Sequence, residues 1–368
     1  MRILFTGGGT GGHIFPITAI KETFNNNPEF QYLGPDDFIK ENLKDIKTRF
    51  ILAGKLYRFF NPLILIEITK TIVGFFQSLF YLFIWIPDVV FSKGGYGAFP
   101  VLFAARLYRI PIIIHDSDAV PGRVTKKTAK FAKKIILSFE NAKKYFKPKQ
   151  QEKIIVIGNP IRQELLNGNK EEGRKMFNIV STPSTTFGIN KPITLILGGS
   201  QGAQKINETV TVNLPKLLEI TEIIHACGEN NFKELEKDTI KSPEYHLYPF
   251  LNTEQQKHAY TLADLIVNRA GAGGIFEIAA LGKPSILIPL PNAAQDHQKE
   301  NAYEYKKISD AIVLEQENLT PNMLIEQISN LLSNPQKMSE MSQKAKSFYN
   351  PQTAELIRDE ILKFTPKQ

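Results

Sequence analysis

The feature that most constrains the fold is a glycine-rich loop that recurs after short apolar runs. Arg2–Thr6 leads into Gly7–Gly12, and Ile193–Leu197 leads into Gly198–Gly202. A third loop, Asn268–Gly274, precedes an apolar helical stretch. Glycine lets the backbone turn with positive φ and lets a ligand approach closely, and the free N–H groups of the following helix favour anions. The pattern predicts parallel strand–helix units with ligand-binding loops at the strand ends.

Apolar runs extend this pattern along the whole chain. Further strands are predicted at 30–33, 89–91, 112–114, 135–137, 154–157, 223–225, 265–267 and 285–288. A length of 368 residues suggests two domains, and the breaker cluster Gly158-Asn159-Pro160 marks their junction. We therefore predict an α/β protein with two Rossmann-like parallel-sheet domains, residues 1–160 and 161–345, facing each other across a cleft. A C-terminal helix, about 346–368, is expected to pack back on the first domain.

Composition excludes several classes of protein. Hydrophobic residues make up 42% of the chain and charged residues 22%, which is enough apolar surface for a core and excludes a disordered chain. The single cysteine, Cys227, excludes a disulfide framework and a cysteine-based zinc site, and it favours a reducing compartment. The first residues run straight into a strand and glycines, so no signal peptide is expected.

The first glycine loop also has the spacing of a dinucleotide-binding loop. Gly7, Gly9 and Gly12 match G-x-G-x-x-G, but that pattern also requires an acidic residue at the end of the second strand. Here the second strand ends in Leu33-Gly34-Pro35. An NAD-dependent oxidoreductase is therefore an alternative that the missing acid disfavours.

Positive charge gathers in one window. Residues 121–153 hold eleven lysines and arginines and two acidic residues, whereas the whole chain has a net charge of +8. The rest of the chain is therefore close to neutral. Such a patch attracts nucleic acid, anionic lipid or a phosphorylated substrate, although a solvated lysine face has the same pattern.

A second unusual segment, 71–87, carries no charged residue and follows further apolar residues from position 56 onward. Its length touches the lower limit for a membrane-spanning helix, about 17 residues. Gly74 and Gln77 inside the segment and Pro87 at its end argue against a span. One helical face carries Ile72, Phe76, Leu79, Phe80 and Phe83. This face is expected to lie in a protein core or, together with the basic window, in a membrane interface.

Five motifs occur together and in order. They are Gly8-Gly9-Thr10-Gly11-Gly12-His13-Ile14-Phe15-Pro16, Lys93-Gly94-Gly95-Tyr96, Gly158-Asn159-Pro160-Ile161-Arg162, Gly198-Gly199-Ser200-Gln201-Gly202-Ala203 and Asp296-His297-Gln298-x-x-Asn301-Ala302. With these motifs the chain resembles the MurG family of peptidoglycan N-acetylglucosaminyltransferases, from Arg2 to about Val313. The resemblance implies a GT-B glycosyltransferase that moves N-acetylglucosamine from UDP-GlcNAc, with inversion, to the C4 hydroxyl of the MurNAc unit of lipid I. The product is lipid II, a precursor of peptidoglycan.

The resemblance also implies partners and a location. The first domain is expected to take the lipid-linked acceptor and the second UDP-GlcNAc, with the enzyme attached peripherally to an anionic membrane surface at the cytoplasmic face of the bacterial cell membrane. Protein partners in cell-wall synthesis are expected, and a nucleic-acid partner is not. Neither a cofactor nor a metal is expected.

The same resemblance supplies candidate site residues. The catalytic candidates are His13 and Asp116, and Tyr96 and His115 are expected on the acceptor side. The substrate-binding candidates are Thr10, Gly11, Gly12, Asp118, Arg162, Ser200, Leu251, Ala272, Gly273, Gly274, Glu277 and Gln298.

Donor binding is expected to centre on the third glycine loop. The helix start after it favours a diphosphate, and Glu277, about one turn further, is suited to accept hydrogen bonds from ribose hydroxyls. The resemblance adds Arg162 and Ser200 at the phosphates, Leu251 beside the uracil and Gln298 at the sugar hydroxyls.

One motif departs from the family. Where the family usually has His-Glu-Gln-Asn, this chain has His115-Asp116-Ser117-Asp118, and a later family asparagine falls on Thr125. At Asp118 the change removes two N–H donors and adds negative charge near a diphosphate.

The general base has two candidates. His13 starts from a pKa of about 6.5, and the positive potential of the helix start beside it favours the neutral form that a base requires. Asp116 starts from a pKa of about 3.9 and needs burial to raise it. We rank His13 first. Other interpretations of the chain are a GT-B transferase that acts on diacylglycerol or a sterol, and a non-enzymatic membrane-associated scaffold.

Overall fold

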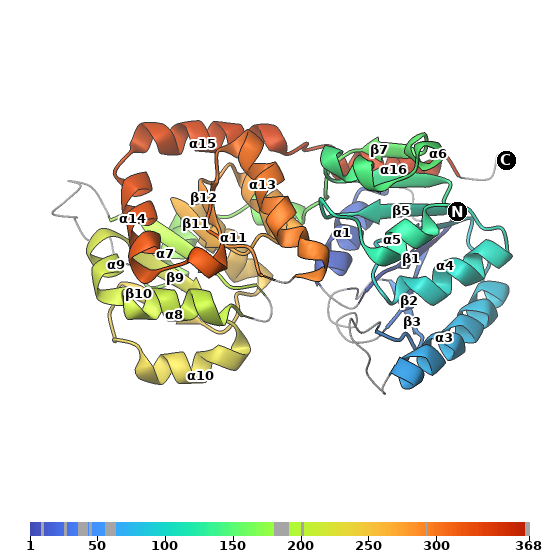
Figure 1. The fold of residues 1–368 in the computed structure, drawn as a ribbon, viewed down its shortest axis with the longest axis horizontal. Coiled ribbons are helices and arrows are strands. Elements are labelled where there is room, and N and C mark those ends of the chain that lie inside the picture. The colour runs from blue at the N-terminus through green and yellow to red at the C-terminus, as the bar shows by residue number, and fades with distance from the viewer. Residues whose placement is uncertain are drawn as a thin grey trace. The chain divides into compact units, whose positions relative to one another are not determined.

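The computed structural model of the protein describes residues 1–8, 11–25, 28–35, 43, 46–55, 64–179, 191–199, 202–291 and 293–364. The chain divides into two compact units. The first unit is Met1–Arg162 with Pro351–Gln368, and the second is Gln163–Asn350. Each unit is built on one parallel sheet covered by helices (Figure 1).

The first unit contains a seven-stranded sheet in the order β3-β2-β1-β4-β5-β6-β7. Its strands are β1 (Arg2–Thr6), β2 (Glu29–Gly34), β3 (Lys47–Phe50), β4 (Val89–Ser92), β5 (Ile112–Asp116), β6 (Lys134–Leu137) and β7 (Ile154–Val156). Its helices are α1 (Gly11–Lys21), α3 (Ile64–Ile84), α4 (Ala98–Leu107), α5 (Arg123–Thr128), η1 (Glu140–Tyr145), α6 (Pro148–Gln151) and α16 (Thr353–Leu362). The strand order reverses between β1 and β4, which is where ligands bind in open parallel sheets.

The second unit contains a six-stranded parallel sheet in the order β10-β9-β8-β11-β12-β13. Its strands are β8 (Ile193–Leu197), β9 (Glu222–Ala226), β10 (Tyr245–Tyr248), β11 (Leu265–Asn268), β12 (Ser285–Leu287) and β13 (Ile312–Val313). Its helices are η2 (Gln163–Leu166), α7 (Lys170–Met176), α8 (Gln204–Val212), α9 (Leu214–Ile220), α10 (Glu229–Asp238), α11 (Thr253–Leu262), α12 (Ala272–Leu281), η3 (Ala294–Asp296), α13 (His297–Ser309), η4 (Gln316–Asn318), α14 (Pro321–Leu332) and α15 (Pro335–Phe348). The order again reverses, between β8 and β11.

The end of the chain belongs to the first unit. Ile357 and Ile361 of α16 are fully buried and share a core cluster with Ile3 and Ile17. The guanidinium of Arg358 donates a hydrogen bond to the Thr23 carbonyl at 2.9 Å. In place of the single helix expected at about 346–368, the chain breaks after α15 and begins α16 at Thr353.

Helix α3 turns Gly74 and Ser78 inward and leaves three of its phenylalanines exposed, while Phe75, Leu79 and Tyr81 pack partly buried against the core. Gly74, Ser78 and Leu82 face the interior, whereas Phe76 and Phe80 are 63% and 60% exposed. The expectation that the phenylalanine face packs in a protein core is therefore wrong.

A close backbone contact explains this orientation of α3. A Cβ atom at Gly74 would lie 1.7 Å from the Leu52 carbonyl oxygen, so only glycine fits there. The backbone N–H groups of Leu52 and Lys55 donate to the side chains of Gln77, at 2.8 Å, and Glu67, at 2.6 Å. The polar residues of α3 therefore hold the segment after β3, and Phe76, Phe80 and Phe83 are left on the outer face.

Candidate functional site

In the first unit, the loops that follow β1, β4, β5 and β7 bring the acceptor-side candidates together. His13 lies in the first turn of α1 and is partly buried. Its Nδ1–H donates to the Lys93 carbonyl at 3.1 Å. In the neutral ring this bond places the lone pair on Nε2. Burial, followed by the charge of Lys93, lowers the pKa of His13 to about 4, so the ring is neutral at physiological pH.

Two glycines make room for this imidazole. A Cβ atom at Gly8 would lie 2.7 Å from Cδ2 of the ring. Gly95 has φ of 79°, and a Cβ atom there would lie 2.9 Å from the backbone nitrogen of Gly8 and 3.1 Å from the His13 Nε2 atom. The first two glycine motifs therefore pack around one side chain.

Lys93 joins three loops through its ammonium group. The side chain is buried, and Nζ donates to Ser117 Oγ at 2.6 Å and to Asn159 Oδ1 at 3.3 Å. Nζ also contacts the Nδ1 atom of His115. Burial lowers the pKa of Lys93 to about 7, against the opposing charges of Asp116 and Asp118. The segments after β4, β5 and β7 are thus fixed to one another by a single amine.

His115 lies beneath these loops and has no exposed surface. Its Nε2–H donates to the Gly158 carbonyl at 2.9 Å, while Nδ1 faces Lys93. Burial lowers the pKa of His115 well below its usual value, which keeps the ring neutral. The structure gives this acceptor-side candidate a supporting position under the loop that leads to Arg162.

Asp116 uses both of its carboxylate oxygens to order its own loop. Oδ1 accepts from the Asp118 backbone N–H at 3.3 Å, and Oδ2 accepts from the Gly122 N–H at 2.9 Å. Burial, followed by the charge of Asp118, raises the pKa of Asp116. Asp116-Ser117-Asp118 has Asp-x-Asp spacing, and the first carboxylate orders the backbone of its own loop. Asp118 acts electrostatically on both His13 and Lys93, which places it within this cluster.

The remaining candidates of the first unit lie around α1 and α4. The Arg162 guanidinium lies 4.0 Å from the centre of the Phe15 ring. Tyr96 precedes α4, and the Lys55 ammonium lies 5.4 Å from its ring centre. Gly11 and Gly12 begin α1, and a Cβ atom at Gly12 would meet no other atom within 4 Å. Thr10 lies outside the described residues.

In the second unit, the donor candidates gather at the start of α12. Gly271 caps the helix, and Cβ atoms at Gly271 and Gly273 would meet no other atom within 4 Å. By contrast, a Cβ atom at Gly274 would collide with the Asn268 amide at 2.5 Å. Ala272 is the first residue of the helix. The first turn of α12 therefore has open backbone for an anion on one side and tight packing on the other.

Glu277 is held by two residues of α11. The Tyr260 hydroxyl donates to Glu277 Oε2 at 2.8 Å, and the Gln256 amide donates to the same oxygen at 3.4 Å. The carboxylate is buried, 9% exposed. Its position on α12 is thus fixed from the neighbouring helix.

The other donor candidates lie after different strands of the same sheet. Leu251 is buried between β10 and α11. Gln298 is the second residue of α13, and its Oε1 atom accepts from the Leu290 backbone N–H at 3.0 Å, which closes the turn after β12. Ser200 lies outside the described residues. The roles assigned to all these residues stay predictions.

Sequence reasoning missed Lys93, Asn159 and Tyr260 as functional residues. Lys93 and Asn159 had a signal, because a lysine at the end of a buried strand and an asparagine in a breaker cluster both fall inside recognised motifs. Tyr260 had none, because its partner lies 17 residues away on another helix.

Comparisons with known proteins match both units. The N-terminal domain of glycosyltransferase family 28 matches residues 3–137, and the C-terminal domain of that family matches residues 193–357. The UDP-N-acetylglucosamine–N-acetylmuramyl-(pentapeptide) pyrophosphoryl-undecaprenol N-acetylglucosamine transferase of Halothermothrix orenii is 35% identical over 95% of each chain. The transferase of the same name from Clostridium kluyveri is 36% identical over 90% of this chain and 91% of its own. The crystal structure of Acinetobacter baumannii MurG has a TM-score of 0.72 and 27% identity, covering 98% of this chain and 99% of that one.

Proposed function

Because this chain belongs to glycosyltransferase family 28 and matches MurG enzymes over nearly its whole length, we infer that it transfers N-acetylglucosamine from UDP-GlcNAc to lipid I. The full-length match, at about 35% identity, carries this conclusion. The protein is a GT-B glycosyltransferase whose product is lipid II, and its place is in peptidoglycan biosynthesis. The two reversals of strand order supply one ligand-binding edge for each substrate.

In this proposal the donor binds the second unit. The open first turn of α12 receives the diphosphate, since its free N–H groups and the helix dipole stabilise negative charge that grows as UDP leaves. Glu277 accepts hydrogen bonds from the ribose hydroxyls. The bonds from Tyr260 and Gln256 support this role, because they fix the carboxylate before the ligand arrives.

In the first unit, His13 acts as the base. The C4 hydroxyl of MurNAc attacks the anomeric carbon of GlcNAc from the face opposite UDP, the bond to the diphosphate breaks, and Nε2 of His13 takes the hydroxyl proton. The bond from Nδ1 to the Lys93 carbonyl supports this role, because it leaves the lone pair on Nε2. Asp116 is the weaker candidate, since both of its oxygens already accept backbone hydrogen bonds.

The enzyme is proposed to attach peripherally to the cytoplasmic face of the bacterial cell membrane. Among the described helices, α3 alone is long and apolar enough to cross a membrane. A peripheral position is favoured, because Glu67 and Gln77 of α3 bind the Leu52–Lys55 backbone of the same unit. Helix α4 contacts both α3 and the basic α5, so the apolar and the cationic segments belong to the same part of the first unit.

Radiolabelled transfer from UDP-GlcNAc to a lipid I analogue tests the function. We expect incorporation of label into lipid I and none into diacylglycerol. Label in diacylglycerol instead would assign the enzyme to a different acceptor class, and hydrolysis of UDP-GlcNAc without transfer would contradict the acceptor assignment.

A further inference from the structure

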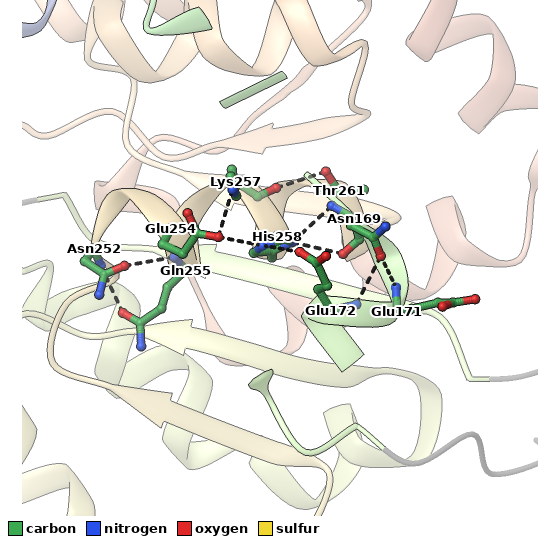
Figure 2. A network of polar contacts seen from close by, with 9 residues as sticks. All are labelled: Asn169, Glu171, Glu172, Asn252, Glu254, Gln255, Lys257, His258 and Thr261. Carbon is green, nitrogen blue, oxygen red and sulfur yellow. Dashed lines mark hydrogen bonds and ion pairs between the residues drawn. The ribbon is translucent and has the colours of Figure 1, made fainter. Parts of the chain in front are cut away.

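We propose that Glu172, Glu254 and His258, in the second unit, form a binding site for one divalent transition-metal cation such as zinc. Glu254 and His258 lie four residues apart on α11, so they share one helix face. Glu172 reaches the same point from α7. Figure 2 shows the three side chains converging, with both carboxylates directed at the imidazole.

The spacing of the ligand atoms suits a tetrahedral ion. The His258 Nε2 atom lies 3.0 Å from Glu254 Oε1 and 3.4 Å from Glu172 Oε2. Zinc holds nitrogen and carboxylate oxygen at about 2.0–2.1 Å, which puts neighbouring ligand atoms of a tetrahedron about 3.3 Å apart. All three ligand atoms lie within 4.8 Å of one another, so the two exposed carboxylates can close around an ion, and water can take the fourth position.

The ring of the histidine is buried and turns Nε2 toward both carboxylates. Its side chain is 1% exposed, whereas those of Glu172 and Glu254 are 65% and 58% exposed. The Asn169 backbone N–H donates to His258 Nδ1 at 3.0 Å, and the Asn169 carbonyl lies 3.0 Å from the same atom. In the metal-free protein Nε2–H donates to Glu254 Oε1 at 3.0 Å. A bound cation would replace that proton, and Nδ1–H would then donate to the Asn169 carbonyl. Donation from the second ring nitrogen to a backbone carbonyl is the usual support of a metal-bound histidine.

The chemistry of the donor set selects the class of cation. One imidazole and two carboxylates suit zinc and neighbouring transition metals, whereas magnesium prefers oxygen ligands and retained water.

Lys257 competes with the ion for one ligand. Its ammonium lies 2.8 Å from Glu254 Oε1, the oxygen that also faces His258. The lysine must swing away when a cation binds. This competition gives the proposal a test that an ordinary ion-pair cluster does not pass, because removal of Lys257 then strengthens metal binding.

A bound ion would join α7 to α11, the helix that also carries Tyr260 and Gln256. Those two residues hold Glu277 on α12. The metal is therefore structural in this proposal, since it fixes a helix that supports the donor loop.

Zinc titration of the full chain tests the site. The chain is first treated with a chelator to remove bound metal, and zinc binding is then measured by calorimetry in competition with a zinc indicator. We expect one zinc ion per chain and a higher melting temperature with zinc than with magnesium. Glu172→Gln should lower zinc affinity at least about tenfold. Glu171→Gln is the matched control, because Glu171 lies in the same helix turn but points away from His258 in Figure 2.

Substitution of Lys257 should have the opposite effect on zinc affinity. Lys257→Gln should raise zinc affinity by about two- to fivefold, the range of an exposed ion pair. X-ray absorption of the zinc-loaded protein should show one histidine nitrogen among oxygen ligands at about 2.0–2.1 Å. Equal zinc affinity in Glu172→Gln and Glu171→Gln, or no zinc bound at all, would overturn the proposal.

Discussion

At His13, the tautomer favours the role of a base, whereas the lowered pKa keeps the ring neutral but weakens its basicity. The bond to the Lys93 carbonyl leaves Nε2 as the acceptor, and the pKa of about 4 keeps the ring neutral. His13→Ala should therefore lower kcat by about 10²- to 10⁴-fold with little change in donor Kd. Asp116→Asn should lower kcat less. The reverse order, with near-normal kcat for His13→Ala, would make the carboxylate the base.

The pH dependence of the wild-type enzyme tests His13 in a second way. A base must be deprotonated, so activity should fall only as pH drops toward about 4. We expect no change in kcat/KM from protonation of His13 between pH 5.5 and pH 7.5. An acid limb centred near pH 6.5 that disappears in His13→Ala would show that the ring titrates at its ordinary pKa.

Lys93 makes folding stability depend on pH. Because the pKa of Lys93 is lowered to about 7 in the folded state, the unfolded chain binds the proton more tightly between about pH 7 and pH 10. Stability should thus rise with pH across this window. The melting temperature of wild type minus that of Lys93→Met should increase from pH 7 to pH 10, as measured by circular dichroism.

An exposed lysine provides the control for that series. Lys130 lies at the end of the α5 region and is exposed, so the difference between wild type and Lys130→Met should stay constant over the same window. A parallel drift in both series would trace the effect to general charge and not to the buried amine.

The contribution of Glu277 to donor binding can be measured apart from that of the residues that hold its carboxylate. Glu277→Ala should weaken UDP binding by about 1–3 kcal/mol, the cost of losing a buried hydrogen-bonding partner. Tyr260→Phe keeps the carboxylate and removes one bond that positions it, so its effect should be smaller. Isothermal titration with UDP measures both. Unchanged UDP affinity in Glu277→Ala would remove this residue from the donor site.

At the scale of elements, most strands were predictable and three were not. The predicted runs correspond to β1, β2, β4–β9, β11 and β12, because strands covered on both faces form nearly continuous apolar runs. The missed strands β3, β10 and β13 all lie at sheet edges. Lys47–Phe50, for example, alternates exposed and partly buried residues. An edge strand is only partly covered, so its sequence need not be apolar, although the edge strand β7 (Ile154–Val156) is apolar throughout and was predicted.

The orientation of α3 shows a second limit of sequence reasoning. Helical spacing correctly placed Phe76, Phe80 and Phe83 on one face, but periodicity does not tell which face is buried. The decisive contact is the Leu52 backbone against Gly74, and it joins segments 22 residues apart. Prediction of the site residues had the same limit. Sequence patterns located His13 and Glu277, but their hydrogen bonds with Lys93 and Tyr260 could be found only in the folded structure.

The exposed face of α3 leads to a membrane prediction. Phe76→Ser with Phe80→Ser should reduce sedimentation with anionic vesicles, because both rings are largely exposed and their loss removes apolar area from the interface. Wild-type binding should fall with salt without vanishing, since charge supplies part of the affinity. Val212→Ser, at a 70% exposed position on α8 of the second unit, is the control. Equal binding by both variants would contradict attachment through α3.

At the scale of the whole molecule, the first unit needs both ends of the chain. Ile357 is fully buried and Leu356 beside it is 37% exposed. Ile357→Ala should lower the free energy of unfolding by about 2–5 kcal/mol, whereas Leu356→Ala should cost much less. Urea unfolding, monitored through the hydrogen exchange of the β1 amides, measures the change in the free energy of unfolding. Equal costs for the two variants would show that α16 does not complete this core.

The position of α16 also sets an order of events on the ribosome. The sheet of the first unit is synthesised first, but the helix that completes its core follows only after the whole second unit. At about 5–20 residues per second, translation from residue 162 to residue 362 takes about 10–40 s. Throughout that interval the nascent sheet lacks α16, and its uncovered isoleucines are a surface for chaperones to protect. The second unit, which is one continuous stretch of chain, can finish folding before the first.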